Sequence, residues 1–193
     1  MRRLSCGILP LSLNQPVDRV TVRLTPRVSY LYPVDKLKKE GRYQRLYEQI
    51  AGLTAKRSTP LSRMATVVAV LSHKMEYFFW TGFYLLEEDE LFVGPYQGPV
   101  ACQHLQKETG VCWAGIQGRK TVVVPDVEAF HGHIACDSRS RSEIVVPLLD
   151  SYGRPVGVLD VDSTSLNAFD ETDALWLERI TALVKPDQTQ AEV

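Results

Sequence analysis

The sequence Ser142-Glu143-Ile144-Val145-Val146-Pro147-Leu148-Leu149 is followed, after the turn Tyr152-Gly153-Arg154-Pro155, by Val156-Gly157-Val158-Leu159-Asp160-Val161-Asp162. Two apolar runs joined by a Gly/Pro turn predict a β-hairpin. Successive strand residues point to opposite faces, so Asp160 and Asp162 share one face. A carboxylate among Val and Leu is costly unless a charged or hydrogen-bonding group meets it. The two acids therefore mark this hairpin as a candidate site.

The segment upstream of the hairpin adds a thiol to these acids. It reads Gly132-His133-Ile134-Ala135-Cys136-Asp137, and Glu143 opens the first strand. One thiol and three acids thus converge on one sheet edge. These segments, with Gly157-Val158-Leu159-Asp160-Val161-Asp162-Ser163, closely resemble the free methionine-(R)-sulfoxide reductases, small enzymes of the GAF fold. The resemblance covers roughly Lys39 to Val184.

Composition excludes several classes of protein. A chain of 193 residues with 45% hydrophobic content is long enough for one domain with a sizeable core. The net charge of -1 argues against a nucleic-acid-binding protein, and no apolar run is long enough to span a bilayer. The four cysteines, Cys6, Cys102, Cys112 and Cys136, are too few for a disulfide scaffold. They indicate reactive thiols in a reducing compartment.

The expected fold is α+β. Periodic apolar residues predict a helix over Lys36 to Leu53, and Ser58-Thr59-Pro60 is typical of a second helix start. Asp170 is expected to cap a C-terminal helix. We expect a GAF-like domain over residues 36–184, with one antiparallel sheet of about six strands. The three helices should cover one face, and the loops that carry the cysteines should form a small pocket on the other.

The chain ends differ in composition from this domain. Residues 1–35 hold five arginines and four prolines, and Asp18 is the only acid before Asp35. An Arg-rich, acid-poor start resembles an organelle transit peptide, but prolines break the amphipathic helix such peptides form. We favour a disordered extension or a misassigned start, with Cys6 outside the chemistry. The expected location is the cytoplasm, or the mitochondrion if the extension is a transit peptide. The tail 185–193 is polar and expected to fray.

Apolar residues recur at helical spacing along each of the two N-terminal helices, and a segment rich in aromatic residues predicts a strand. The stripes expected in the core are Tyr43, Leu46, Tyr47, Ile50 and Leu53, then Leu61, Met64, Val68, Leu71 and Met75. In the strand over residues 78–86, period two puts Trp80, Gly82 and Tyr84 on one face. The resemblance implies that Trp80 and Tyr84 are substrate-pocket aromatics, and rings suit the sulfur of a sulfoxide. Gly82 is expected to leave room for the ligand.

Three interpretations of Cys102, Cys112 and Cys136 remain open on the residues alone. They could be inert buried side chains. They could bind metal with His104, His131 and His133, although no Cys-x-x-Cys knuckle is present. They could be redox partners, which the neighbouring acids favour because sulfoxide reduction needs a proton donor.

The resemblance implies a mechanism. Cys136 attacks the sulfoxide sulfur, and Glu143, kept protonated by Asp160 and Asp162, is our candidate acid. A sulfenic acid on Cys136 then condenses with a second thiol, and a thioredoxin-type dithiol resets the enzyme. We expect Cys102 to be that thiol, because Cys112 lies at a helix start, where the dipole lowers its pKa but the backbone is fixed and Trp113 replaces the glycine usual in the family.

The resemblance also implies the substrate. We expect free methionine-(R)-sulfoxide, with its ammonium held by acids among Glu143, Asp160 and Asp162, and no metal, flavin or nucleotide. The other expected partner is the dithiol reductant, and a homodimer is considered. The alternative is a GAF sensor module, since one fold serves many functions. A sensor has no use for three cysteines in this arrangement.

Overall fold

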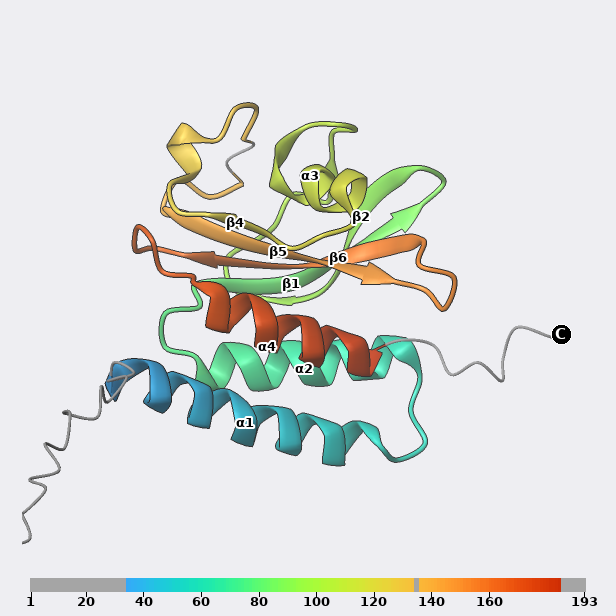
Figure 1. Ribbon diagram of the computed structural model, residues 1–193. Coiled ribbons are helices and arrows are strands. Elements are labelled where there is room, and N and C mark those ends of the chain that lie inside the picture. Colours follow the sequence, from blue (N-terminus) through green and yellow to red (C-terminus); the bar gives the residue numbers. More distant parts are fainter. Residues whose placement is uncertain (1–33, 134–135, 185–193) are drawn as a thin grey trace, which may run out of the picture. The chain divides into compact units, whose positions relative to one another are not determined.

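The predicted hairpin is formed by β5 (Ser142–Leu149) and β6 (Pro155–Ser163), which pair antiparallel. The computed structural model describes residues 34–133 and 136–184 (Figure 1). The Asp150 carboxylate closes the turn by accepting from the backbone N–H groups of Tyr152 and Arg154, at 2.8 and 2.9 Å. Gly153 there has a φ of +74°, a conformation that glycine adopts without steric cost.

The sheet has six strands, and every pairing is antiparallel. The other strands are β1 (Trp80–Glu87), β2 (Glu90–Gln97), β3 (His104–Leu105) and β4 (Val122–Val124). Their order is β3-β2-β1-β6-β5-β4, as expected in number and in direction. The strand β2 continues through Gly94 to Gln97, with a bulge opposite the stretch between Gly82 and Tyr84.

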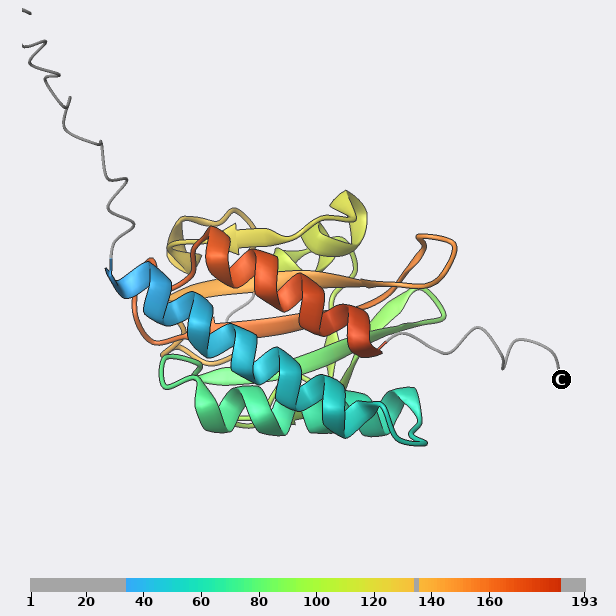
Figure 2. The same ribbon diagram turned by 60° about the horizontal axis from the view of Figure 1, so that its bottom comes forward.

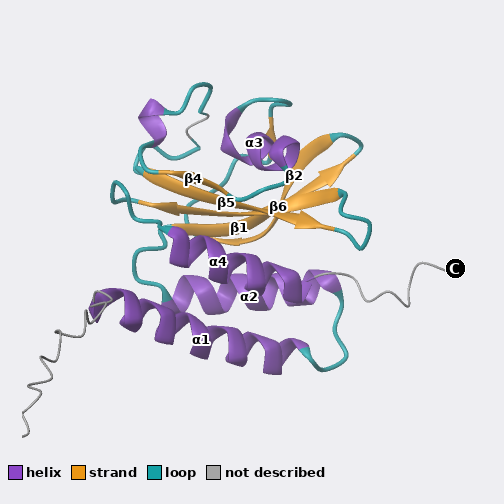
Figure 3. Ribbon diagram, viewed as in Figure 1, coloured by secondary structure: helices purple, strands orange, loops and turns teal. Residues whose placement is uncertain are grey.

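Three helices cover one face of the sheet, as predicted. They are α1 (Val34–Thr54), α2 (Pro60–Lys74) and α4 (Glu171–Thr181), and Figure 2 brings them forward. Their core packs on Phe83, Ile144 and Leu159 of the sheet. The fourth helix, α3 (Gly110–Gly118), lies on the opposite face (Figure 3). Short 3-10 turns at Val127–Ala129 and Ala182–Val184 complete the α+β architecture.

Both predicted helix starts are confirmed. The Thr59 and Asp170 side chains cap α2 and α4, each in a reciprocal capping box. The α4 box includes Asp173, whose fully buried carboxylate accepts from the hydroxyls of Tyr43 and Tyr77, at 2.7 and 2.6 Å, and from Lys39. These bonds tie α1 to the start of α4.

Two of the expected core residues are on the surface. Leu53 is 51% exposed at the end of α1, and Leu61 is 60% exposed in the first turn of α2. Both fit the helical period, but the last turn of α1 buries Thr54 instead, and the buried residues of α2 begin at Arg63. The other residues of the two stripes are buried or packed against the core.

The described residues do not include the whole predicted tail, 185–193. They also leave out most of the predicted N-terminal extension, with Cys6. The first helix begins at Val34, two residues before its expected start. Among the described helices, none combines the length and apolar character needed to cross a membrane.

Candidate active site

The alternation of β5 and β6 separates the site from the helix-covered core. Val145 and Val158 pack on the α3 side of the sheet, whereas Ile144 and Leu159 belong to the helix-covered side. Glu143 and Asp160 alternate in phase with the first pair. All three predicted acids therefore face α3 and line one pocket of about 50 Å³.

The three acids are close neighbours in the sheet. Glu143 is the cross-strand partner of Asp162, and Asp160 stands two residues along the same strand. Burial, and then the charge of Asp162, raise the pKa of Glu143 well above its ordinary value. Burial also raises the pKa of Asp160, and that of Asp162 from 3.8 to about 6. The predicted resistance of Glu143 to ionisation is confirmed, although burial is a larger cause than like charge.

Asp160 has an unused acceptor. Its Oδ1 atom is buried and has no hydrogen-bond partner among the described residues. A buried polar atom in this state costs free energy that a bound donor recovers. Because Asp160 lines the pocket, a ligand carrying an ammonium group is well suited to supply that donor.

Cys112 lies in the first turn of α3, as predicted, and is buried beside the acids. The expectation that the helix start lowers its pKa is wrong. Burial, and then the negative charges of Asp160 and Glu143, raise the pKa of the thiol well above its ordinary value. Desolvation by packing thus outweighs the helix dipole here. Cys112 is a protonated thiol at neutral pH.

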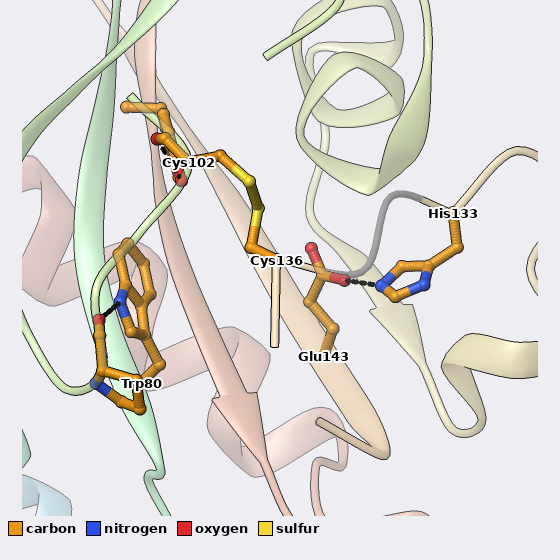
Figure 4. Close-up of a disulfide and its surroundings, with 7 residues drawn as sticks. Trp80, Cys102, His133, Cys136 and Glu143 are labelled. Atoms are coloured by element: carbon orange, nitrogen blue, oxygen red, sulfur yellow. Dashed lines mark hydrogen bonds and ion pairs between the residues drawn. A yellow bond between two sulfur atoms is a disulfide. The ribbon is translucent and has the colours of Figure 1, made fainter. Parts of the chain in front are cut away.

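Cys102 and Cys136 form a disulfide, with 5.7 Å between their Cα atoms (Figure 4). The two residues stand 34 positions apart in the sequence, and the pairing is the predicted one. Cys136 lines the pocket. Cys102 follows the loop after β2, and its backbone oxygen accepts a hydrogen bond from the Tyr84 hydroxyl at 3.1 Å. The Cys102 backbone therefore lies next to Tyr84, which lines the pocket.

The loop after Cys136 is fixed by charge and by ring contact. Asp137 accepts hydrogen bonds from the backbone and guanidinium of Arg139, and these hold the pKa of its carboxyl at about 2. The same guanidinium lies over the Phe79 ring, with its carbon 4.8 Å from the ring centroid. These contacts anchor the chain close to the Cys136 sulfur.

The aromatic wall is a stack of three rings. Trp80 stacks between Tyr84 and Tyr96, with centroid distances of 5.8 and 5.5 Å, and its indole N–H donates to the Pro99 oxygen. Gly82 does not leave room for a ligand, contrary to expectation. A Cβ there would lie 2.4 Å from Tyr96 Cβ and 2.5 Å from the Trp80 ring. The glycine is needed so that these rings can close over the strand.

Two site residues were not identified from the sequence as part of the acid cluster. His133 Nε2 lies 3.5 Å from a Glu143 carboxylate oxygen, and Figure 4 shows the two side chains pointing toward each other. Ser140 lines the pocket, and its hydroxyl hydrogen-bonds to Asp162. His133 had a signal, since it stands three residues before Cys136, but it was considered only as a metal ligand.

The expectation of no metal stays a prediction. Among the described residues, Cys112 Sγ and one oxygen each of Glu143 and Asp160 lie within 4.8 Å of one another, an arrangement that could hold a cation. Cys112 was among the ligands that the sequence suggested, but this cluster contains none of the histidines considered there. His104 instead pairs with Glu90 at 3.6 Å, on the exposed β2–β3 edge.

Comparison with known proteins agrees with this geometry. The model of the GAF domain family matches residues 64–185. GAF domain-containing protein A of Dictyostelium discoideum is 47% identical over 152 residues, which are 78% of this chain and 95% of that protein. Free methionine-R-sulfoxide reductase of Escherichia coli is 38% identical over 140 residues, covering 72% of this chain and 84% of the relative.

A solved structure gives the same relationship in three dimensions. It is the X-ray structure of free methionine-R-sulfoxide reductase from Neisseria meningitidis in complex with its substrate. It is 44% identical in sequence, superimposes with a TM-score of 0.72, and covers 76% of this chain and 87% of its own. This chain belongs to the GAF domain family and, within it, to the free methionine-R-sulfoxide reductases.

Proposed function

We propose that this protein reduces free L-methionine (R)-S-oxide to L-methionine with cysteine thiols. The observation that carries the proposal is the Cys102–Cys136 disulfide, which lies beside a pocket lined by the three acids. A thiol pair supplies the two electrons that a sulfoxide needs, and protonated carboxyls supply the protons. The reductases to which this chain is similar carry the same activity in their names.

The reaction begins at Cys136. Its thiolate attacks the sulfoxide sulfur while Glu143 protonates the sulfoxide oxygen, a poor leaving group until it is protonated. The oxygen passes to the Cys136 sulfur as a sulfenic acid, and methionine leaves. The raised pKa of Glu143 supports this role, since burial and the charge of Asp162 favour the protonated form of the acid.

Cys102 completes the cycle. Its thiol attacks the sulfenic sulfur of Cys136, water leaves, and the disulfide seen in the structure forms. A dithiol reductant of the thioredoxin type then restores both thiols by exchange. The sum is one sulfoxide and two thiols giving one thioether, one disulfide and one water. Cys112, with its raised pKa, stays a thiol and acts as a helper or backup.

The substrate is held at both of its ends. The stacked rings of Trp80 and Tyr84 pack on the sulfur side. Asp160, with its unpartnered oxygen, and Asp162 receive the ammonium group. An amide nitrogen in a peptide carries no charge to offset these acids, so we infer a preference for the free amino acid.

The redox chemistry also indicates where the protein works. A protein whose disulfide must be reduced in every turnover works in a compartment that supplies dithiols, and we place it in the cytoplasm. A homodimer stays a prediction, which light scattering tests. Reactive cysteines of this kind favour an enzyme over a GAF sensor.

Adding methionine sulfoxide to the fully reduced protein tests the function. The protein should lose two titratable thiols and release about one equivalent of methionine, whereas a sensor loses none. With a dithiol present, turnover should continue on the free amino acid and be nearly absent on its N-acetylated, amidated derivative. Equal rates on the two compounds would contradict the ammonium site but not the redox chemistry.

A further inference from the structure

The acid Glu143 lines the pocket but has little contact with water. Its side chain is 7% exposed, and its neighbours Asp160 and Cys112 are buried as well. Each turnover takes a proton from this group, if the proposed function holds. The carboxylate left behind is a buried anion beside two further acids, so the next cycle must wait until it is reprotonated.

His133 bridges this acid and the surface. Its Nε2 atom lies 3.5 Å from the Glu143 carboxylate, and its side chain is 14% exposed, twice the value for Glu143. Gly132, next to it, is exposed and has a φ of +78°, which turns the chain at the rim of the pocket. The imidazole thus lies between Glu143 and solvent, where it can take a proton from water and give one to the carboxylate.

We propose that His133 is a proton relay that recharges Glu143 between turnovers. The imidazole takes a proton from water at Nδ1 and passes its Nε2 proton to the Glu143 carboxylate. It then exchanges with water to recover its starting tautomer. No electron moves in this step, and the net change is one proton from solvent to Glu143. The proposal rests on the proposed function, because it concerns the acid of that reaction.

Asp162 is a weaker candidate for this role. It stands opposite Glu143 in the sheet, and its carboxyl is held by Ser140. When a carboxyl passes on its proton, it becomes an anion beside the acids, and like charges at this distance repel. A protonated imidazole is a cation beside the carboxylate anion, and it becomes neutral when it gives up its proton. The charge balance therefore favours His133.

Kinetics of the first and later turnovers test the relay. The reduced resting enzyme already holds the Glu143 proton, so His133→Ala should release the first equivalent of methionine at a rate within about 2-fold of the parent. Later turnovers under saturating dithiothreitol should slow by about 10-fold or more, short of the about 10²–10⁴-fold that a direct general acid contributes. Added imidazole should restore the later rate. His133→Gln should behave like the alanine variant, but with less rescue.

His131→Ala is the matched control. His131 is an exposed histidine of the same loop and does not line the pocket, so both rates should stay those of the parent. If the two His133 variants lose both rates equally and imidazole restores neither, His133 only holds the loop. If later turnovers keep the parental rate, the relay is wrong. A parent protein that releases no methionine overturns the proposed function itself, which is a different result.

Discussion

Replacing Asp162 by Asn should make the stability of the folded protein less dependent on pH. Burial raises the pKa of this carboxyl from its ordinary value of 3.8 to about 6. An acid whose pKa is raised on folding stabilises the protein fully below the unfolded value and loses that contribution as the pH rises through the folded value. The affected window therefore extends from just below pH 4 to just above pH 6.

The shift sets the size of the effect. At 1.36 kcal/mol per pKa unit, ionising Asp162 costs the folded state about 3 kcal/mol in total, of which about 2 kcal/mol falls between pH 4.5 and pH 8. Asn cannot ionise, so the variant should lose about 2 kcal/mol less than the parent over that interval. Because the charge of Asp162 also raises the pKa of Glu143 and acts on that of His133, the difference includes this coupling as well as the ionisation of Asp162 itself.

Urea unfolding of the oxidised protein, followed by tryptophan fluorescence at both pH values, measures the change. Asp150→Asn is a control of opposite sign. Hydrogen bonding from the Arg154 backbone lowers the pKa of Asp150, so this acid stabilises the protein above its unfolded pKa, and the contribution is lost as the pH falls. Equal pH slopes for the parent and the Asp162 variant, or a steeper slope for the variant, would refute the reasoning.

Four further substitutions separate roles within the site. Glu143→Gln should fold and lose turnover by about 10²–10⁴-fold; parental rates at neutral pH would move the acid role to Asp162. Cys136→Ser should release no methionine, whereas Cys102→Ser should release about one equivalent and stall with thioredoxin alone; peptide mapping that finds only a Cys112–Cys136 link in the oxidised parent contradicts this assignment. Gly82→Ala should cost about 1–3 kcal/mol of stability, seen in thermal unfolding, because its methyl group meets Tyr96 and Trp80; an unchanged melting temperature counts against the ring stack.

The sheet and its polar face were predictable because their signal is local. Period two along β6 fixes which side Asp160 and Asp162 occupy, whatever packs around them. The end caps Thr59 and Asp170 are equally local, since each acts on its own helix. The Cys102–Cys136 pairing came from the resemblance and from backbone freedom.

The errors concern distances across the fold, which the sequence does not encode locally. The pKa of Cys112 depends on its burial and on the acids of β5 and β6, and together these outweigh the effect of its own helix start. The space above Gly82 is taken by Tyr96 from the next strand. Leu61 fits a helical stripe, but its exposure depends on what packs around the first turn of α2, which the sequence does not show. His133 stands ten residues before Glu143, and only the fold brings the two side chains together.

The alternation along β6 also divides the ways in which this protein can change over evolution. Leu159 and Val161 are buried against the helices, whereas Asp160 and Asp162 line the pocket. Mutations at the first pair act on how much folded protein a cell retains, through lost packing. Mutations at the second pair remove buried charge, so they spare abundance while altering turnover or substrate choice. A lineage can therefore acquire a new ligand at alternate positions of one strand without first finding a new core.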